Sequence, residues 1–197
     1  MTKMKPSLSV VIVGRNDNYQ KQWLERLEFC LNYNLLNLAK AGLKNSVDFH
    51  IVDHLSNTKI SSVIRTQKTS STVYFHEVSE SNTNYLKFHL SYALNVGLDK
   101  PDADLILLMG ADQFFSSDIW KRLFDLISNG DDYSKGEDSY FLIPRKQLPP
   151  MFKFDLISYS HLDNILEKIP GSIWKFRHMK KNLGFHQGFE LLFWSNL

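Results

Sequence analysis

The chain has 197 residues, of which 43% are hydrophobic and 22% are charged, a composition typical of one globular domain. Its formal net charge of +2 provides no bulk attraction to nucleic acid or to anionic membranes. We find no run of about 18 apolar residues that would span a bilayer. The single cysteine, Cys30, excludes an intramolecular disulfide and favours a reducing compartment. We therefore expect a cytoplasmic protein with no transmembrane segment and no nucleic-acid partner.

Strands and helices alternate through the first 115 residues. Short β-branched apolar runs predict strands, and apolar residues at helical spacing predict helices. The second helix is predicted to place Leu90 on its apolar side and to end at a Gly97 cap. Such alternation predicts an α/β fold with a mostly parallel sheet. The predicted strands are residues 8–13, 47–52, 72–78 and the central 105–109, and the helices are residues 23–41, before Gly42, and 85–97.

From Ser116 onward the pattern becomes less regular. A short helix capped by Ser117 or Asp118 is predicted to run to Ile127, followed by a strand at residues 140–144 and irregular sequence near residue 150. The chain stops three residues after the apolar segment 191–194, an abrupt end that a fragment of a longer protein would also show.

Three polar segments stand at the ends of predicted strands, which is where ligands bind in open α/β sheets. A glycine there lets the backbone approach a flat ring closely. One carboxylate can accept hydrogen bonds from a base or ribose, and another can ligate a hard cation that bridges phosphates. The three segments together predict a nucleoside diphosphate site. They are Gly14-Arg15-Asn16-Asp17, Asp53, and Gly110-Ala111-Asp112.

Four segments, in the order that the family has them along the chain, resemble glycosyltransferase family 2. Residues 9–17 (SVVIVGRND) are similar to its opening strand and loop, and residues 51–56 (IVDHLS) to its second strand with a base-binding aspartate. Residues 93–97 (ALNVG) and 105–112 (LILLMGAD) are similar to its Asn-x-Gly helix and metal-binding motif. The resemblance implies a GT-A fold, a three-layer α/β/α sandwich around a Rossmann-like sheet. It also implies a nucleotide diphosphate sugar donor, with a UDP-sugar favoured, Mn²⁺ or Mg²⁺, and a glycan or other hydroxyl acceptor.

By this resemblance, residues 1–115 form the donor half of a single domain and residues 116–197 its acceptor side. The usual Asp-x-Asp motif is here Gly110-Ala111-Asp112, so one carboxylate remains for the metal. The family's motif for the acceptor-activating base has no clear copy, and Glu190 and His186 are the nearest candidates. The implied nucleotide-binding residues are Gly14, Arg15, Asn16, Asp53, His89 on the second helix, and Asn95, with Lys87 as an alternative to His89.

Each of these residues also has a structural interpretation. An aspartate at a strand end often shapes a turn, as Asp53 would, or caps a helix, as Asp112 would. Asn95 is equally consistent with a solvent-facing position, and Glu190 and His186 with structural partners in an apolar strand. The basic run at residues 175–181 reads as a solvated face. Aromatic residues, including Tyr159, usually build core.

Two other functions remain open from the sequence. A nucleotidyltransferase would use a similar fold, although residues 15–18 are a poor version of its triphosphate loop. A non-catalytic nucleotide-sugar or glycan-binding domain would explain both the missing first aspartate and the missing base motif. Glycine motifs of dehydrogenases and P-loop enzymes are absent, as is zinc-ligand spacing, which disfavours those classes.

Overall fold

The computed structural model describes residues 7–17, 22–66, 71–78, 88–103, 105–129, 139–144, 158–160, 162, 177–180 and 189–194. In these ranges one seven-stranded sheet has the order β3-β2-β1-β4-β7-β5-β6. The strands are β1 (Leu8–Gly14), β2 (Val47–His54), β3 (Val73–Val78), β4 (Leu105–Met109), β5 (Ser139–Pro144), β6 (Arg177–Lys180) and β7 (Phe189–Trp194). The helices are α1 (Trp23–Ala41), α2 (Ile60–Val63), α3 (Leu90–Leu98) and α4 (Ser117–Asn129).

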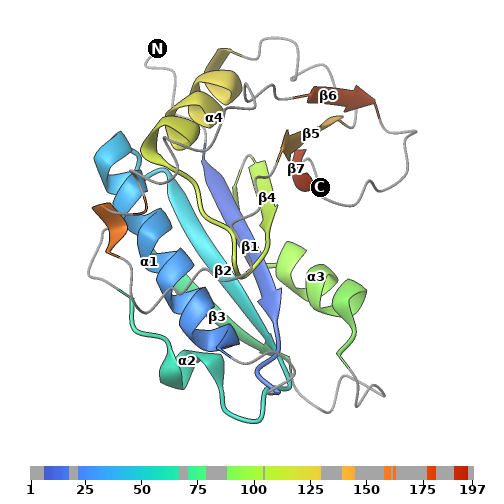
Figure 1. Cartoon of the computed structure of the whole chain (residues 1–197). Coiled ribbons are helices and arrows are strands. Elements are labelled where there is room, and N and C mark those ends of the chain that lie inside the picture. Colours follow the sequence, from blue (N-terminus) through green and yellow to red (C-terminus); the bar gives the residue numbers. More distant parts are fainter. Residues whose placement is uncertain are drawn as a thin grey trace.

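Strands β1 to β4 pair only in parallel with one another, whereas β5, β6 and β7 pair only in antiparallel fashion. β1 pairs in parallel with β2 and with β4, and β2 pairs in parallel with β3. β7 runs antiparallel to β4 and to β5, and β6 runs antiparallel to β5. The carboxyl ends of the four parallel strands therefore meet at one edge of the sheet, which we call the carboxyl edge (Figure 1).

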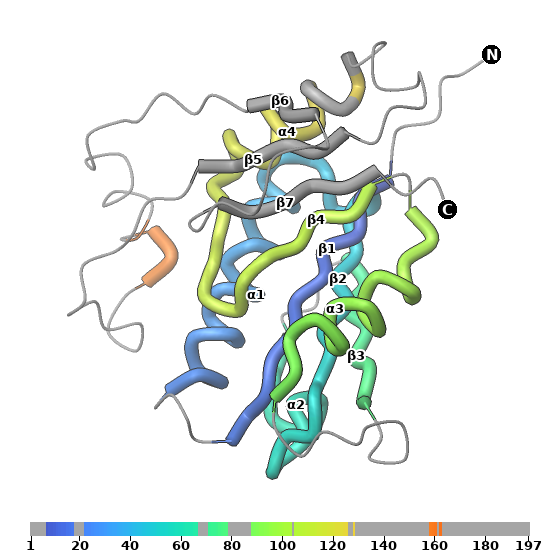
Figure 2. The backbone as a smooth tube through the Cα atoms, turned by 90° about the vertical axis from the view of Figure 1, so that its right-hand side faces the viewer, coloured from blue at the N-terminus to red at the C-terminus, as the bar shows by residue number. Residues whose placement is uncertain are grey.

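Helices cover both faces of the parallel strands, as Figures 1 and 2 show from two directions. α1 and α4 contact each other and bury one face, where Leu31, Phe49 and Trp120 belong to the main core cluster. α3 lies on the opposite face, where Ala93 is buried against Val52. The predicted α/β fold with three layers and a mostly parallel sheet is confirmed.

The predicted strands and first helix agree with the structure closely. β1 ends at Gly14 as expected, and β4 lies between β1 and β7 within the sheet. Gly42 ends α1 in the left-handed conformation, with φ 76°, and its N–H donates to the carbonyls of Ala39 and Leu38, the geometry in which a glycine cap is favoured. Cys30 is buried in α1. No helix in the described ranges is both long and apolar enough to cross a bilayer.

The second helix was predicted wrongly in three respects. α3 begins at Leu90, so His89 is its N-cap instead of a residue within it, and residues 85–87 lie outside the described part. The Leu90 side chain is exposed. Gly97 lies inside α3, and the C-cap is Asp99. A Cβ on Gly97 would lie 2.6 Å from Val11 Cγ1, so the glycine lets the helix approach the sheet closely.

Candidate functional site

The loops that follow β1 and β2 are joined by two hydrogen bonds at the carboxyl edge. The Asn16 N–H donates to Ser56 Oγ at 2.7 Å, and the Asn57 N–H donates to the Asn16 carbonyl at 3.1 Å. Arg15 Nε lies 3.5 Å from Asp17 Oδ2 within the first loop. The structure thus brings the predicted loop after β1 beside the loop after β2 and fixes their backbones relative to each other.

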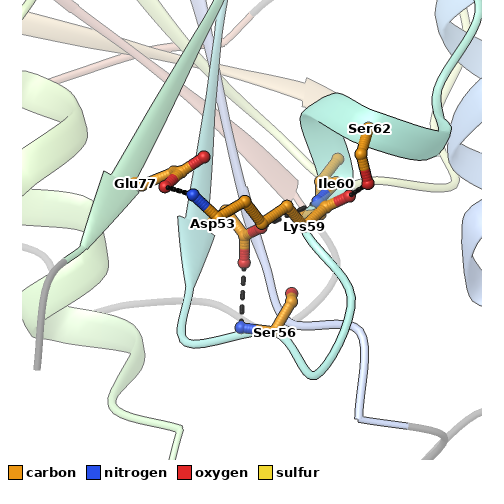
Figure 3. Close-up of polar contacts among 6 residues, drawn as sticks. All are labelled: Asp53, Ser56, Lys59, Ile60, Ser62 and Glu77. Carbon is orange, nitrogen blue, oxygen red and sulfur yellow. Dashed lines mark hydrogen bonds and ion pairs between the residues drawn. The ribbon is translucent and has the colours of Figure 1, made fainter.

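Asp53 holds the second loop from inside, as Figure 3 shows. Its Oδ1 accepts the Ser56 N–H at 3.1 Å, and its Oδ2 accepts the Ile60 N–H at 2.8 Å at the start of α2. The side chain is buried, and Leu55, inside the turn that it closes, has a left-handed φ of 57°. This geometry agrees with the structural interpretation of Asp53 given above, in which the aspartate shapes a turn. Its predicted contact with a nucleotide stays a prediction.

The predicted glycine at the end of β1 has an aromatic ring against it. A Cβ on Gly14 would lie 2.1 Å from Trp23 Cζ2, so the indole of Trp23 occupies the space that a side chain would fill. Trp23 is the first residue of α1 and is half-buried. The flat ring that approaches Gly14 in this structure is therefore one of the chain's own.

A buried asparagine of α1 holds the loop that follows β4. Asn34 Oδ1 accepts the Phe115 N–H at 2.8 Å, while its Nδ2 donates to the Gln113 carbonyl at 3.0 Å and to the Cys30 carbonyl at 2.9 Å. Gln113 Oε1 also accepts the Gly110 N–H. Sequence analysis missed Asn34. The available signal was a polar residue among the apolar positions of an amphipathic helix.

Asp112 lies in the turn between β4 and α4, and its side chain is exposed. No group of three or more histidine, cysteine, aspartate or glutamate side chains among the described residues has metal-binding geometry. Mg²⁺ is commonly held by one or two carboxylates together with substrate phosphates and water. A single exposed carboxylate at this edge fits that mode of binding and does not fit a cage made of protein ligands alone.

The predicted catalytic candidates are only partly covered by the structure. Glu190 lies in β7, one residue before Leu191, which pairs with Leu108 of β4. This register places the backbone of Glu190 at the carboxyl edge, near the turn that carries Asp112. His186 lies outside the described residues. The roles of both as catalytic groups stay predictions.

The remaining predicted nucleotide residues lie on or beside α3. His89, exposed, accepts the Tyr92 N–H on its Nδ1 at 3.2 Å and so caps the helix. α3 lies between the parallel strands β3 and β4 in the chain, so its amino terminus, where His89 lies, is near the carboxyl edge. Asn95 is exposed further along the helix, as its solvent-facing interpretation predicts, and its role in nucleotide binding stays a prediction.

One buried histidine at the carboxyl edge was missed by sequence analysis. His54, the last residue of β2, has 0% exposure, and neither of its ring nitrogens has a hydrogen-bond partner among the described residues. Burial lowers the pKa of His54, and electrostatic interactions with Arg15 and His89 lower it further, while the backbone of His54 itself and the charge of Asp53 act in the opposite direction. The sequence signal was the position of His54, directly after Asp53 at the end of a predicted strand.

Tyr159, from the second part of the chain, belongs to an aromatic cluster on α1. Its ring centroid lies 5.1 Å from that of Phe29 and 5.8 Å from that of Tyr33, and the Tyr33 ring also contacts Phe114 at 5.2 Å. Burial raises the pKa of Tyr159. These contacts agree with the expectation that the aromatic residues mainly build core.

Comparisons with known proteins show the fold. No protein-family model matches the chain, and none of the curated proteins matches it in sequence. Three crystal structures of S. aureus TarS 1-349, one without a named ligand, one with UDP and one with UDP-GlcNAc, each match with a TM-score of 0.51. Their identities to this chain are 18%, 16% and 16%.

The TarS matches cover 75% of this chain but only 40%, 38% and 36% of the three TarS chains, in the same order. The chain therefore spans well under half the length of the structures that it matches. At these identities the likeness concerns the fold alone, and the expected GT-A-like α/β fold is confirmed.

Proposed function

We propose that this chain is a glycosyltransferase that holds a nucleotide diphosphate sugar, with a UDP-sugar favoured, at the carboxyl edge and transfers the sugar to an acceptor hydroxyl. One observation carries the proposal: the loops after β1 and β2 are hydrogen-bonded together beside a buried carboxylate in a GT-A-like sheet. In this fold type, ligands bind outside the carboxyl ends of the strands. The complexes of TarS with UDP and UDP-GlcNAc support this choice of donor.

The proposed roles follow from position. The loop after β1, with Arg15 and Asn16, lies beside the donor nucleotide, and Glu190 removes the acceptor proton as general base. Asp112 would hold Mn²⁺ or Mg²⁺, which, when bound, neutralises charge on the departing diphosphate. The loops themselves fix the donor relative to the acceptor, because a positioned pair reacts without the entropy loss of an encounter.

Nucleoside diphosphates should raise the melting temperature, since a ligand that binds only the native state stabilises it by mass action. The test is a thermal shift series with UDP, GDP and dTDP, with and without Mn²⁺, followed by an assay of UDP-sugar hydrolysis. Absence of a shift with every saturating nucleotide would contradict the proposal. Binding without turnover would favour a non-catalytic nucleotide-sugar domain, and release of pyrophosphate from a triphosphate would favour a nucleotidyltransferase.

Asp112→Asn should remove the Mn²⁺-dependent part of UDP affinity and leave uridine binding unchanged, because an amide oxygen lacks the full charge that a hard cation requires. Turnover should fall by about a hundredfold or more, as for other groups that stabilise developing charge. Isothermal titration with and without Mn²⁺ measures both affinities. Asp118→Asn, an exposed aspartate in the first turn of α4, is the matched control. Full metal dependence in Asp112→Asn would contradict the assignment.

A further inference from the structure

His54 presents an unsatisfied buried imidazole at the carboxyl edge. Its side chain is fully buried, and among the described residues neither Nδ1 nor Nε2 has a hydrogen-bond partner. A buried polar group without a partner is costly and uncommon in native structures. A group that is retained despite this cost is a candidate for satisfaction by a ligand.

The His54 ring lies against the first turn of α3. It makes edge-to-face contacts with Phe88, at 5.5 Å between ring centroids and an interplanar angle of 85°, and with Tyr92, at 6.3 Å and 82°. α3 has nine residues, and the first N–H groups of a helix have no acceptor within it. His89 Nδ1 accepts one of them, that of Tyr92. His54 therefore stands beside the positive end of a helix dipole, where anions are favoured.

Basic groups from three different elements converge on this place. Arg15, in the loop after β1, and His89, before α3, are both near enough to His54 for their charges to lower its pKa, in addition to the larger effect of burial. Asp53 is the acidic group that acts on His54 in the opposite direction, and both of its oxygens already accept backbone N–H groups. Tyr92 is the other titratable side chain in contact.

We propose that Arg15, His54 and His89, with the amino terminus of α3, form an anion subsite that binds the diphosphate of the donor, and that His54 takes up a proton when this anion binds. The subsite deepens the proposed function and rests on it for the identity of the ligand. The partly exposed ring of Phe88 packs edge-to-face against His54, so the proposal requires this ring to move aside to admit the phosphate oxygens.

Proton uptake follows from the change in charge around His54. Without an anion, burial above all keeps the imidazole neutral at pH 7.5, because the pKa of His54 lies below the ordinary value of 6.5. A phosphate group that carries negative charge reverses the sign of the local potential and favours the imidazolium. A proton moves from solvent to His54 as the complex forms, and the new N–H donates to a phosphate oxygen.

The experiment is isothermal titration of the full chain at pH 7.5 with UDP, pyrophosphate and uridine, each in two buffers of different ionisation enthalpy. UDP and pyrophosphate should bind with net proton uptake, and uridine should bind with none. His54→Gln should abolish the uptake and weaken UDP binding by about tenfold to a hundredfold, the range for a lost hydrogen bond to a charged group. Uridine affinity should not change.

His76→Gln is the matched control. Burial also lowers the pKa of His76, but its Nε2 shares a hydrogen bond with Nδ1 of His50, on the neighbouring strand, at 2.9 Å. The control variant should keep the full proton uptake. His54→Leu replaces the unsatisfied ring with an apolar side chain, so it should fold at least as stably as the wild type and still lose the uptake. This variant keeps the test valid if His54→Gln folds poorly.

The outcomes separate the subsite from the proposed function. UDP binding without proton uptake, or with undiminished affinity in both His54 variants, overturns the subsite and leaves the function standing. Proton-coupled pyrophosphate binding without any nucleotide affinity supports the subsite and overturns the function. Failure of all three probes to bind overturns both.

Discussion

At Asp53, both carboxylate oxygens accept backbone N–H groups, one from Ser56 and one from Ile60. The bond to Ile60 is buried, so removing its acceptor leaves a buried donor without a partner. The sequence pattern singled out this residue for contact with a nucleotide, but position alone did not distinguish a carboxylate that holds a ligand from one that holds a loop. Each carboxylate oxygen has a second lone pair, so Asp53 can hold the loop and still accept a hydrogen bond from a ligand.

Asp53→Ala should therefore lower the free energy of unfolding by about 1–3 kcal/mol for the orphaned Ile60 N–H, measured by urea denaturation. Ser56→Ala keeps the Asp53 bonds and loses only the acceptor of the Asn16 N–H, in a half-buried loop, so it should cost less. Uridine titration of folded Asp53→Ala then tests the ligand role separately. Unchanged stability would contradict the structural role.

Among the helices, α3 departs most from its sequence prediction. Periodicity assigned Leu90 to the apolar side, and glycine statistics assigned Gly97 to the cap, yet Leu90 is exposed and Gly97 is buried against the sheet. The short helix lies across β1 and β2, and close approach at Gly97 decides which side faces the sheet. Sequence periodicity carries no information on how near a helix comes to its sheet.

Gly97→Ala tests this close approach. The added Cβ would lie 2.6 Å from Val11 Cγ1 and 3.0 Å from Val52 Cγ2, and overpacking of this kind costs about 1–3 kcal/mol. The gain in helix propensity, about 1 kcal/mol, offsets part of it, so net destabilisation is expected in urea denaturation. Asn95→Ala, on the exposed side of the same helix, should be neutral or slightly stabilising. A more stable Gly97→Ala would show that the helix has room to move.

Across the whole molecule, the parallel half of the sheet was predictable because its strands are short and, apart from the edge strand β3, are buried over most of their length. The same holds for the grouping of Gly14, Asp53 and Asp112 at one edge, which follows from parallel strands sharing a direction. The contacts of the buried residues Asn34 and His54 were not predictable, because these contacts join segments far apart in sequence. Asn34, for example, reaches Phe115 from α1. Such contacts require the tertiary structure.

The stability of the molecule should fall as the pH drops below about 6.5. Burial, followed by neighbouring positive charge, lowers the pKa values of His54 and His76 from their ordinary value of 6.5, so below that pH the unfolded chain binds protons that the folded chain does not. Each such proton contributes a limiting slope of about 1.4 kcal/mol per pH unit. Stability from these histidines is fully present above pH 6.5 and is lost as the pH falls towards their folded-state pKa values.

Asp48 acts in a lower range of pH. Burial raises the pKa of Asp48, but the His50 ring, whose Nε2 lies 3.5 Å from Asp48 Oδ1, and a hydrogen bond from Ser9 bring it below the ordinary value of 3.8, so its contribution to stability is present above about pH 3.8 and is lost below. Urea denaturation between pH 8 and pH 5 therefore isolates the histidines. The double variant His54→Leu, His76→Gln should flatten the profile in that range. A wild-type profile that is already flat from pH 8 to pH 5 would contradict the lowered pKa values.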